Sequence, residues 1–293
     1  RQQTTANRFT FTLALTVHLG VDLDRGVVPV ADALPPRSIP TTIHPSIEVH
    51  VMKPRLLTLA LLSLSLASAW GVSAVAQDAN ADFVLPATDD GLPGAGPIRR
   101  YGWFTDLWKN RRGQFASRAA AERGGIVFLG DSITQGWGDD FRGDFKDLTV
   151  GNRGISGDTT RGMLIRLKED VLGLNPSAVV MLMGTNDLEE HAEPKTIAAN
   201  VKLIIRDLKK HNSEMPIVLC LVFPSSASKS RSSDQIQQLN GLLAAAVKGD
   251  PQVTVVDTWT LFADENGDAK KNEFPDLLHP NRLGYEKWLA AIW

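Results

Sequence analysis

Three residues of the sequence have the types and spacing of a nucleophilic catalytic unit. Ser132 follows Gly130-Asp131, and Asp276 lies three residues before His279. A serine hydroxyl is a weak nucleophile until an imidazole accepts its proton. The imidazole in turn needs a carboxylate that fixes its tautomer and stabilises its charged form. The pattern therefore predicts Ser132 as a nucleophile, His279 as its base and Asp276 as the carboxylate partner of His279.

Acyl transfer also needs hydrogen-bond donors for the negative charge that develops on the carbonyl oxygen, each worth roughly 3–4 kcal/mol. We expect three donors: the backbone amide of Ser132, the backbone amide of Gly154 and the side-chain amide of Asn186. A glycine at position 154 lets the backbone approach a substrate closely. Asp187 is expected to brace its own loop by hydrogen bonds.

Apolar runs and helical patterns alternate along the part of the chain that carries these residues. Strands are predicted at 126–129, 148–150, 178–183, 217–223 and 253–256, and helices at 101–123, 158–173, 194–212, 233–248 and 282–292. Asp158 and Thr159 are the expected caps of the second of these helices. Continuous apolar strands between helices are typical of a parallel sheet that is covered on both faces. We predict a three-layer α/β/α sandwich with the flavodoxin-like strand order 2-1-3-4-5.

The chemical residues follow the predicted strands, and open α/β sheets bind ligands at that carboxyl edge. In the order 2-1-3-4-5, the first strand puts Ser132 between Gly154 and Asn186. The fifth strand lies three places away, roughly 14 Å at the usual spacing of strands. The loop over 261–278 is long enough to cross that distance at about 3.3 Å per residue. His279 is therefore expected above Ser132.

These segments together resemble the conserved blocks of the SGNH (GDSL) hydrolases. The first block is matched by Gly130-Asp131-Ser132-Ile133-Thr134-Gln135-Gly136, the second by Gly154, the third by Gly184-Thr185-Asn186-Asp187 and the fifth by Asp276-Leu277-Leu278-His279-Pro280. They occur in family order and span nearly all of 125–293. The resemblance implies a serine ester hydrolase that uses no cofactor and no metal.

Within that family, the segment 154–161 and the pattern Leu278-His279…Gly284-Tyr285 are most similar to the catalytic subunits of platelet-activating factor acetylhydrolase Ib and their bacterial relatives. This resemblance implies removal of small acyl groups, acetyl above all. Those subunits are usually cytosolic, whereas residues 52–76 of this chain are expected to be an export signal, so their lipid substrate is not carried over. The expected substrate is a small ester, either an acetylated sugar or a short-chain lipid.

Composition limits the partners. Hydrophobic residues make up 43% of the chain, charged residues 22%, and the formal net charge is −2. These values are ordinary for a globular protein and predict no nucleic-acid partner. Six histidines and the single cysteine Cys220, which we expect to be buried, exclude a cysteine-rich zinc site and an internal disulfide. The oligomeric state is not indicated.

The first 76 residues are not expected to belong to the fold. Residues 52–76 begin Met52-Lys53-Pro54-Arg55, continue with a leucine-rich run and end in Ala74-Val75-Ala76, as a secretory signal peptide does. Cleavage is expected after Ala76, with Ala69 as the alternative, and would give a secreted or periplasmic protein without stable membrane insertion; a retained anchor is the other reading. We expect residues 1–51 to be translated from upstream of the true start, 77–100 to be a flexible lead-in and 101–293 to be the hydrolase domain. The chain ends at Trp293 inside a predicted helix, so a little C-terminal sequence is expected to be missing.

Other functions fit the sequence less well. The α/β-hydrolase elbow Gly-x-Ser-x-Gly is excluded because Thr134 stands two residues after Ser132. A flavodoxin-like nucleotide binder would need a phosphate-cradling glycine run after the first strand. A catalytically silent carbohydrate- or lipid-binding module on the same fold would be expected to lack part of the triad. Two roles stay open for Trp137, in an acyl or sugar pocket or in packing under the first helix, and two for 225–233, as a mobile rim or a solvated loop.

Overall fold

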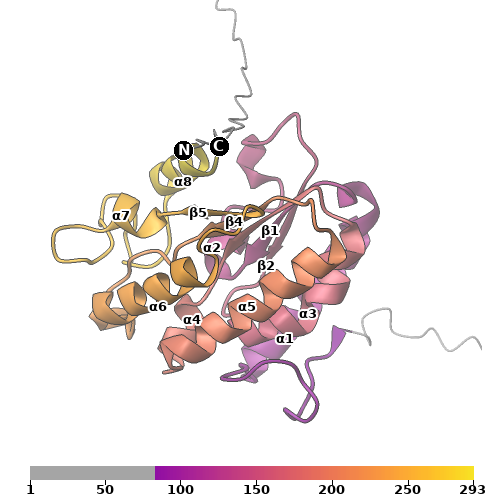
Figure 1. Ribbon diagram of the computed structural model, residues 1–293, viewed down its shortest axis with the longest axis horizontal. Helices are drawn as coiled ribbons and strands as arrows, with labels where there is room; N and C mark the ends of the chain where they lie inside the picture. The colour runs from indigo at the N-terminus through magenta and orange to yellow at the C-terminus, as the bar shows by residue number, and fades with distance from the viewer. Residues whose placement is uncertain (1–82) are drawn as a thin grey trace, which may run out of the picture. The chain divides into compact units, whose positions relative to one another are not determined.

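The computed structural model describes residues 83–293, and a five-stranded parallel sheet forms their centre (Figure 1). The strand order is β2-β1-β3-β4-β5, as predicted. The strands are β1 Ile126–Gly130, β2 Val150–Gly154, β3 Ala178–Leu182, β4 Ile217–Cys220 and β5 Val253–Val256. All four pairings are parallel. The sheet confirms the predicted fold class and places the carboxyl ends of β2, β1 and β3 side by side.

Helices cover both faces of this sheet. The long helices are α1 Gly102–Glu122, α3 Thr160–Asp170, α5 Pro194–His211, α6 Ser233–Ala246 and α8 Arg282–Ile292. Three short helices, α2 Ser132–Gly136, α4 Thr185–Glu189 and α7 Thr258–Phe262, directly follow or closely follow strands, and 3-10 turns lie at Phe141–Gly143, Leu172–Leu174 and Ala227–Lys229. Figure 1 shows α1, α3, α5 and α6 on the near side of the sheet and α8 apart from them.

Alternate strand residues enter two separate cores, as the period of two along a strand requires. One core packs β-strand side chains against α3, α5 and α6; its members include Val127, Leu129, Val179, Met181, Ile217 and Leu219. The other packs Phe128, Val180, Leu182 and Cys220 against aromatic residues that include Trp137, Tyr285 and Trp288. The three-layer arrangement follows from this division.

Trp137 belongs to the second core. Its side chain is fully buried and packs against Phe128, Phe141 and Trp288. Its indole N–H donates to Asp144 at 2.8 Å, so the polar atom of the ring is also satisfied. Of the two roles left open by the sequence, the structure supports packing.

Two elements differ from prediction because buried polar residues interrupt the apolar pattern. The second strand was expected at 148–150 but runs over Val150–Gly154. Its buried Asn152 donates to the carbonyls of Thr134 and Gly138, and its buried Arg153 pairs with Glu122. Such pairing removes the penalty of burying polar groups in a strand.

The helix expected at 158–173 begins instead at Thr160 and ends at Asp170. Thr159 alone caps it, by accepting from the amide of Gly162. Asp158 pairs with Arg166 at 2.8 Å rather than capping, and both side chains are fully buried. Asp158, one of the two expected caps, is therefore part of a buried ion pair that ties the start of α3 to its own second turn.

The described part of the segment expected to be a flexible lead-in makes specific side-chain contacts. Asp89 accepts from Arg161 at 2.5 Å and from Arg100 at 2.6 Å, and Asn200 donates to the carbonyl of Ala95 at 2.8 Å. Leu85 is buried. Residues 83–100 are therefore held against α3 and α5. The predicted upstream segment 1–51, the signal peptide 52–76 and the residues up to 82 lie outside the described residues.

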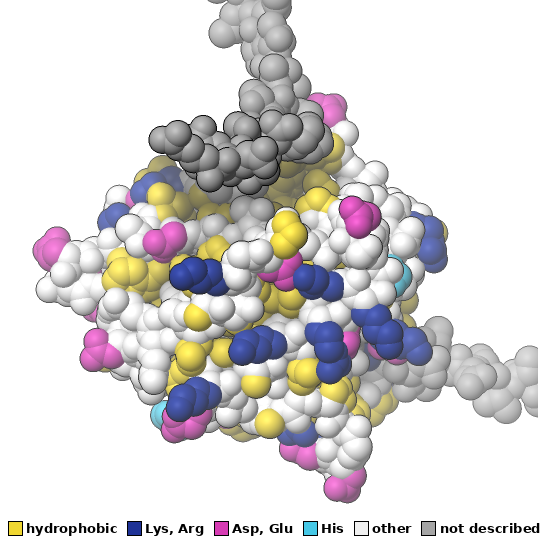
Figure 2. All heavy atoms as spheres, viewed as in Figure 1, with side chains coloured by type: hydrophobic (Ala, Val, Ile, Leu, Met, Phe, Trp, Pro, Cys, Tyr) yellow, Lys and Arg dark blue, Asp and Glu magenta, His cyan; other side chains and the backbone are white. Residues whose placement is uncertain are grey.

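On the side of the molecule that Figure 2 shows, Lys and Arg side chains lie at separate places, and hydrophobic side chains are visible between them. Within residues 83–293, no helix has the length and apolar character needed to cross a lipid bilayer.

Candidate active site

Ser132 is the first residue of α2, directly after β1. Asp131 caps this short helix by accepting from the amide of Ile133 at 2.9 Å. A Cβ atom at Gly130 would lie 2.1 Å from Thr134 Oγ1 and 2.7 Å from the carbonyl of Leu182, so only glycine fits the turn. The turn aims the Ser132 side chain out of the carboxyl edge of the sheet and leaves its amide among the unpaired first amides of a helix.

The structure brings the three predicted side chains into one hydrogen-bonded chain. His279 Nε2 lies 2.9 Å from Ser132 Oγ, and His279 Nδ1 lies 2.7 Å from Asp276 Oδ2. Both distances are within the reach that proton transfer needs. With Nδ1 bonded to a carboxylate, the tautomer with hydrogen on Nδ1 leaves Nε2 as an acceptor for the serine proton.

Asp276 is fixed by the backbone of its own turn. Its Oδ1 accepts from the amides of Leu278 and His279, at 3.0 and 2.7 Å. Partial burial opposes ionisation, but the hydrogen bonds from the amide and ring of His279 and from the amide of Leu278 outweigh it and lower the pKa of Asp276. The carboxylate is therefore charged at neutral pH, as a partner for an imidazolium must be.

Two contacts anchor the loop that carries His279. Ser225 Oγ donates to the carbonyl of Leu277 at 2.8 Å, and Leu277 has a left-handed backbone with φ of 65°. Beyond the loop, the buried Tyr285 hydroxyl on α8 donates to the carbonyl of Ile133 on α2 at 2.8 Å. The loop of His279 thus leads into α8, and α8 is hydrogen-bonded to α2, the helix that carries Ser132.

Asn186 lies on α4 after β3, and its side-chain amide is held at both ends. Its Oδ1 accepts from Arg99 and Arg231 at 3.5 and 3.3 Å, and its Nδ2 donates to the carbonyl of Asp158 at 2.9 Å. Arg99 and Arg231 also both pair with Glu189. Two guanidinium groups on Oδ1 orient Nδ2, so its second hydrogen faces away from them and can serve as a donor.

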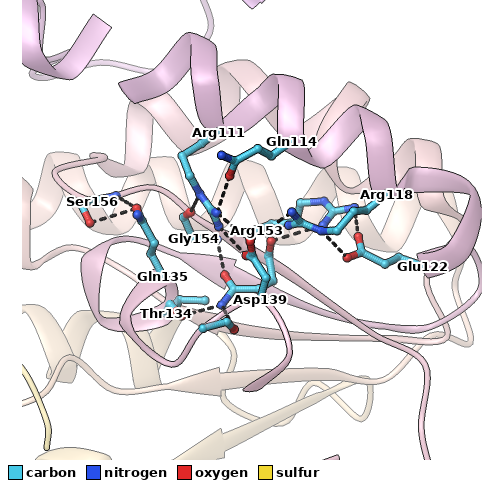
Figure 3. A network of polar contacts seen from close by, with 12 residues as sticks. Arg111, Gln114, Arg118, Glu122, Thr134, Gln135, Asp139, Arg153, Gly154 and Ser156 are labelled. Atoms are coloured by element: carbon cyan, nitrogen blue, oxygen red, sulfur yellow. Dashed lines mark hydrogen bonds and ion pairs between the residues drawn. The ribbon is translucent and has the colours of Figure 1, made fainter. Parts of the chain in front are cut away.

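Gly154 does not fit the donor role that the sequence predicted. Its amide donates to Asn152 Oδ1 at 2.9 Å, and its carbonyl accepts from Arg111 at 3.2 Å. A Cβ atom at Gly154 would lie 2.2 Å from the amide nitrogen of Gln135. Glycine is required there because β2 passes directly under α2. Figure 3 shows Gly154 within the polar network of Arg111 and Asp139.

Gly157, three residues further along, is the better candidate. Among the described residues its amide has no hydrogen-bond partner, and its φ is 84°. The preceding Ser156 is held by Gln135 of α2, through its amide at 2.6 Å and its hydroxyl at 2.9 Å (Figure 3). The carbonyl of the following Asp158 is held by Asn186. Gly157 therefore sits between the helix of Ser132 and the Asn186 side chain.

Sequence reasoning missed Gly157, Arg99 and Arg231. The signal for Gly157 was a glycine directly before the Asp158-Thr159 pair that precedes a helix. Neither arginine had a signal, because Arg99 lies in the expected lead-in and Arg231 in the serine-rich segment. In that segment Ser225, Ser226 and Arg231 are buried, whereas Ala227, Ser228 and Ser230 are exposed, so only its middle is a solvated loop.

Three buried carboxyl groups lie behind this edge. Burial raises the pKa of Asp131 to about 6, against the hydrogen bond from Ile133. Burial raises the pKa of Asp158 to about 6, against its pairing with Arg166. Burial also raises the pKa of Asp187 to about 7, although the amide and hydroxyl of Thr160 donate to it at 2.9 and 2.6 Å. Asp187 thus braces α4 against α3, as expected, rather than facing substrate.

Cys220 is buried, as predicted. Burial raises the pKa of its thiol to about 12, and the indole of Trp288 donates to its sulfur. Within residues 83–293, no three His, Cys, Asp or Glu side chains are grouped as metal ligands would be.

Known proteins are similar to this chain in sequence and in fold. The family model for GDSL-like lipases/acylhydrolases matches residues 128–287. Over 188 residues the chain is 29% identical to platelet-activating factor acetylhydrolase IB subunit alpha1 of Rattus norvegicus, covering 63% of this chain and 80% of that protein. The human alpha2 subunit is 27% identical over 185 residues, covering 62% and 80%.

Solved structures agree with these relatives. A GDSL-like lipase from Bacteroides thetaiotaomicron is 27% identical with a TM-score of 0.55, covering 62% of this chain and 95% of its own. A protein from Streptococcus pneumonia has a TM-score of 0.59 at 23% identity, covering 65% and 92%, which shows the fold alone. Since the family model matches more than half of the residues, the chain belongs to the GDSL-like lipase/acylhydrolase family and is a carboxylic ester hydrolase.

Proposed function

We propose that this protein is an exported serine esterase that removes short acyl groups, acetyl above all, through a Ser-His-Asp acyl-enzyme mechanism. The observation that carries the proposal is the continuous hydrogen-bonded chain from Ser132 Oγ through the His279 ring to Asp276.

In the first step, His279 Nε2 accepts the proton of Ser132 Oγ as the oxygen attacks the carbonyl carbon of the ester. The electron pair of the carbonyl moves to its oxygen, giving a tetrahedral oxyanion. Asp276 stabilises the imidazolium through Nδ1–H without itself taking the proton. His279 then protonates the leaving alcohol, and the carbon–oxygen bond to it breaks.

The oxyanion needs donors that point at it before the reaction begins. The amide of Ser132, the free hydrogen on Asn186 Nδ2 and the amide of Gly157 are the donors that we assign. Gly157 replaces Gly154 in this role because the amide of Gly154 is bonded to Asn152. In the second half of the reaction, water attacks the acyl carbon as it loses a proton to His279. The bond from the acyl carbon to Ser132 Oγ then breaks, and His279 returns the proton to Ser132 Oγ as the acid leaves.

Acetyl specificity and export rest on different support. The relatives named above are acetylhydrolases by name, and they are 29% and 27% identical to this chain over 188 and 185 residues. Export rests on the basic, apolar and small-residue pattern of residues 52–76 in the sequence. Mass spectrometry of the exported protein should find an N-terminus at Gln77, and an N-terminus before Met52 would contradict the proposed signal.

A silent binding module on this fold is disfavoured because the three side chains are all present and bonded to one another. The decisive experiment is turnover of p-nitrophenyl acetate by the mature protein. Ser132→Ala should reduce kcat by about 10⁶-fold, as loss of a triad nucleophile does, with an unchanged circular dichroism spectrum. Ser117→Ala, an exposed serine on α1, is the matched control. Unchanged turnover in Ser132→Ala would refute the proposal.

A further inference from the structure

A hollow of about 490 Å³ opens beside the candidate active site. It is lined by Arg99, Tyr101, Trp103, Glu189, Glu190 and His191. This volume is within the range of pockets that hold small ligands. Its lining comes from residues 99–103, at the start of α1, and from residues 189–191, at the end of α4. The first segment lies outside residues 128–287, which the family model matches, and the second lies inside them.

The hollow adjoins the groups that we assign to the oxyanion. A Cβ atom at Gly157 would lie 2.7 Å from the Trp103 ring and 3.1 Å from Arg99 Nη1. Arg99 in turn donates to Asn186 Oδ1 and to Glu190. A ligand in the hollow would therefore lie next to Gly157 and Asn186, two of the groups that we assign to the oxyanion.

Two aromatic rings form an exposed wall of this hollow. Tyr101 and Trp103 are 52% and 55% exposed, and their ring planes lie 14° apart with centroids separated by 6.3 Å. Trp103 is also fixed from behind by an edge contact with Phe104 at 5.7 Å. Large aromatic side chains left exposed but held in place are characteristic of binding surfaces.

Ionised and polar groups face the same space. The Tyr101 hydroxyl donates to Glu190 at 3.3 Å, and Arg99 pairs with both glutamates. Partial burial of Glu189 is outweighed by hydrogen bonds and charge from Arg99 and Arg231, which lower its pKa. Carboxylate oxygens in this state accept hydrogen bonds from hydroxyl groups. Because arginine charges balance the glutamates, the hollow favours a neutral, hydroxyl-rich ligand.

We propose that this hollow is a carbohydrate subsite that binds a pyranose ring of an O-acetylated oligosaccharide. The apolar face of the sugar packs on Tyr101 and Trp103, and its hydroxyls bond to Glu189 and Glu190. An acyl chain would instead need a lining without ionised groups. The inference deepens the proposed function and rests on it, since the subsite is useful only if Ser132 cleaves the neighbouring ester.

A larger hollow, about 610 Å³, lies elsewhere and carries no such inference. It is lined by residues of α3 and α5 that include Lys168, Lys210 and His211. These residues lie toward the C-terminal ends of their helices, which in a parallel α/β sheet run back to the edge opposite the carboxyl ends of the strands. Its ligands would lie far from Ser132.

The first test compares two substrates, O-acetylated xylotriose and p-nitrophenyl acetate, with wild type, Trp103→Ala and Trp103→Phe. In Trp103→Ala the ratio of kcat/KM for the saccharide to kcat/KM for the small ester should fall at least tenfold, chiefly through KM for the saccharide. Trp103→Phe keeps a ring and should recover most of the ratio. Trp293→Ala, which removes another exposed tryptophan, is the control and should keep the ratio within twofold.

An unchanged ratio in Trp103→Ala would overturn the subsite. The subsite would also be overturned if Trp103→Ala lowered the ratio for a phospholipid with an acetyl ester and not for the saccharide, because Tyr101 and Trp103 would then bind lipid. Failure of the proposed function has a different signature, namely wild-type turnover of p-nitrophenyl acetate that does not depend on Ser132.

Binding gives a readout that does not depend on turnover. Ser132→Ala should bind O-acetylated xylotriose in calorimetric titration, and adding Trp103→Ala should weaken that binding at least tenfold. Adding Trp293→Ala instead should leave it unchanged. Equal binding in the two double variants would overturn the subsite even if catalysis proceeds as proposed.

Discussion

The two halves of the candidate active site are built in opposite ways. The half on the carboxyl ends of β1, β2 and β3 is buried: Asp131, Asp187 and Asn186 are almost fully enclosed, and each is bonded to backbone or to a second element. The half on the loop before α8 is open: the side chains of His279 and Asp276 are 43% and 45% exposed.

The difference matches the work that we propose for each half. Donors for an oxyanion act best when they are fixed in advance and shielded from water. A histidine that must accept and return protons, and then activate water, benefits from contact with solvent. The side chains of the buried half are therefore fixed in place. The position of the loop that carries His279 depends instead on a few hydrogen bonds. Each half makes a different prediction when one group is changed.

Apart from loss of the nucleophile itself, the largest effect is expected on the open half, from Asp276→Asn. The amide keeps an oxygen for the Leu278 and His279 amides but presents N–H to His279 Nδ1, which favours the tautomer that cannot accept the serine proton. We expect kcat for p-nitrophenyl acetate to fall about 10³- to 10⁴-fold. Asp147→Asn, at an exposed carboxylate, should behave as wild type. A loss smaller than tenfold would mean that solvent replaces the carboxylate in this open site.

A smaller effect is expected on the buried half, from Asn186→Ala. Loss of one oxyanion donor lowers kcat by about 10²- to 10³-fold, with little change in KM. Asn186→Asp keeps the acceptor for Arg99 and Arg231 but removes the donor, so its loss should be as large. Asn266→Ala, at an exposed position, is the control. If KM alone rises in Asn186→Ala, this side chain binds the ground state and is no oxyanion donor.

The same contrast explains what could be predicted from the sequence. The five strands, the long helices and the hydrogen-bonded group of Ser132, His279 and Asp276 were predictable because apolar runs, helical periodicity and the Asp276-x-x-His279 spacing are local patterns. The bounds of β2 were not, because Asn152 and Arg153 are polar residues buried through distant partners. Helices α2 and α4 have five residues each, too few for a periodic signal.

The donor set was predicted only in part for the same physical reason. The sequence predicts Gly154 as a donor, but the side chain of Asn152, two residues away, accepts the hydrogen bond from the Gly154 amide. The orientation of Asn186 depends on Arg99 and Arg231, which lie 87 and 45 residues from it in the chain. Tertiary hydrogen bonds of this kind leave no pattern in the sequence around them.

The smallest expected effect concerns stability rather than catalysis, and it tests how closed the buried half is. A carboxyl group with a raised pKa in the folded state keeps its proton there after the unfolded chain, with a pKa near ~3.9, has lost it. Its contribution is therefore present at low pH and is lost as pH rises from about 4 through the folded pKa. For Asp131 and Asp158 that window ends at about 6, and for Asp187 at about 7.

In Asp187→Asn, the part of this loss of folding stability that occurs between pH 6 and 7 should be absent. Between pH 6 and 7 the folded state binds about three quarters of a proton more than the unfolded chain, which is worth about 1 kcal/mol. The wild-type Tm should therefore fall by about 3 °C more than that of the variant. Groups with lowered pKa, such as Asp276 and Asp139, act below pH 4 and do not enter this window. Thermal melts at half-unit pH steps measure the difference between the two proteins, which cancels the histidines they share. Parallel curves between pH 6 and 7 would mean that Asp187 is ionised behind the site, and that the buried half stabilises its charge by more than the hydrogen bonds from Thr160.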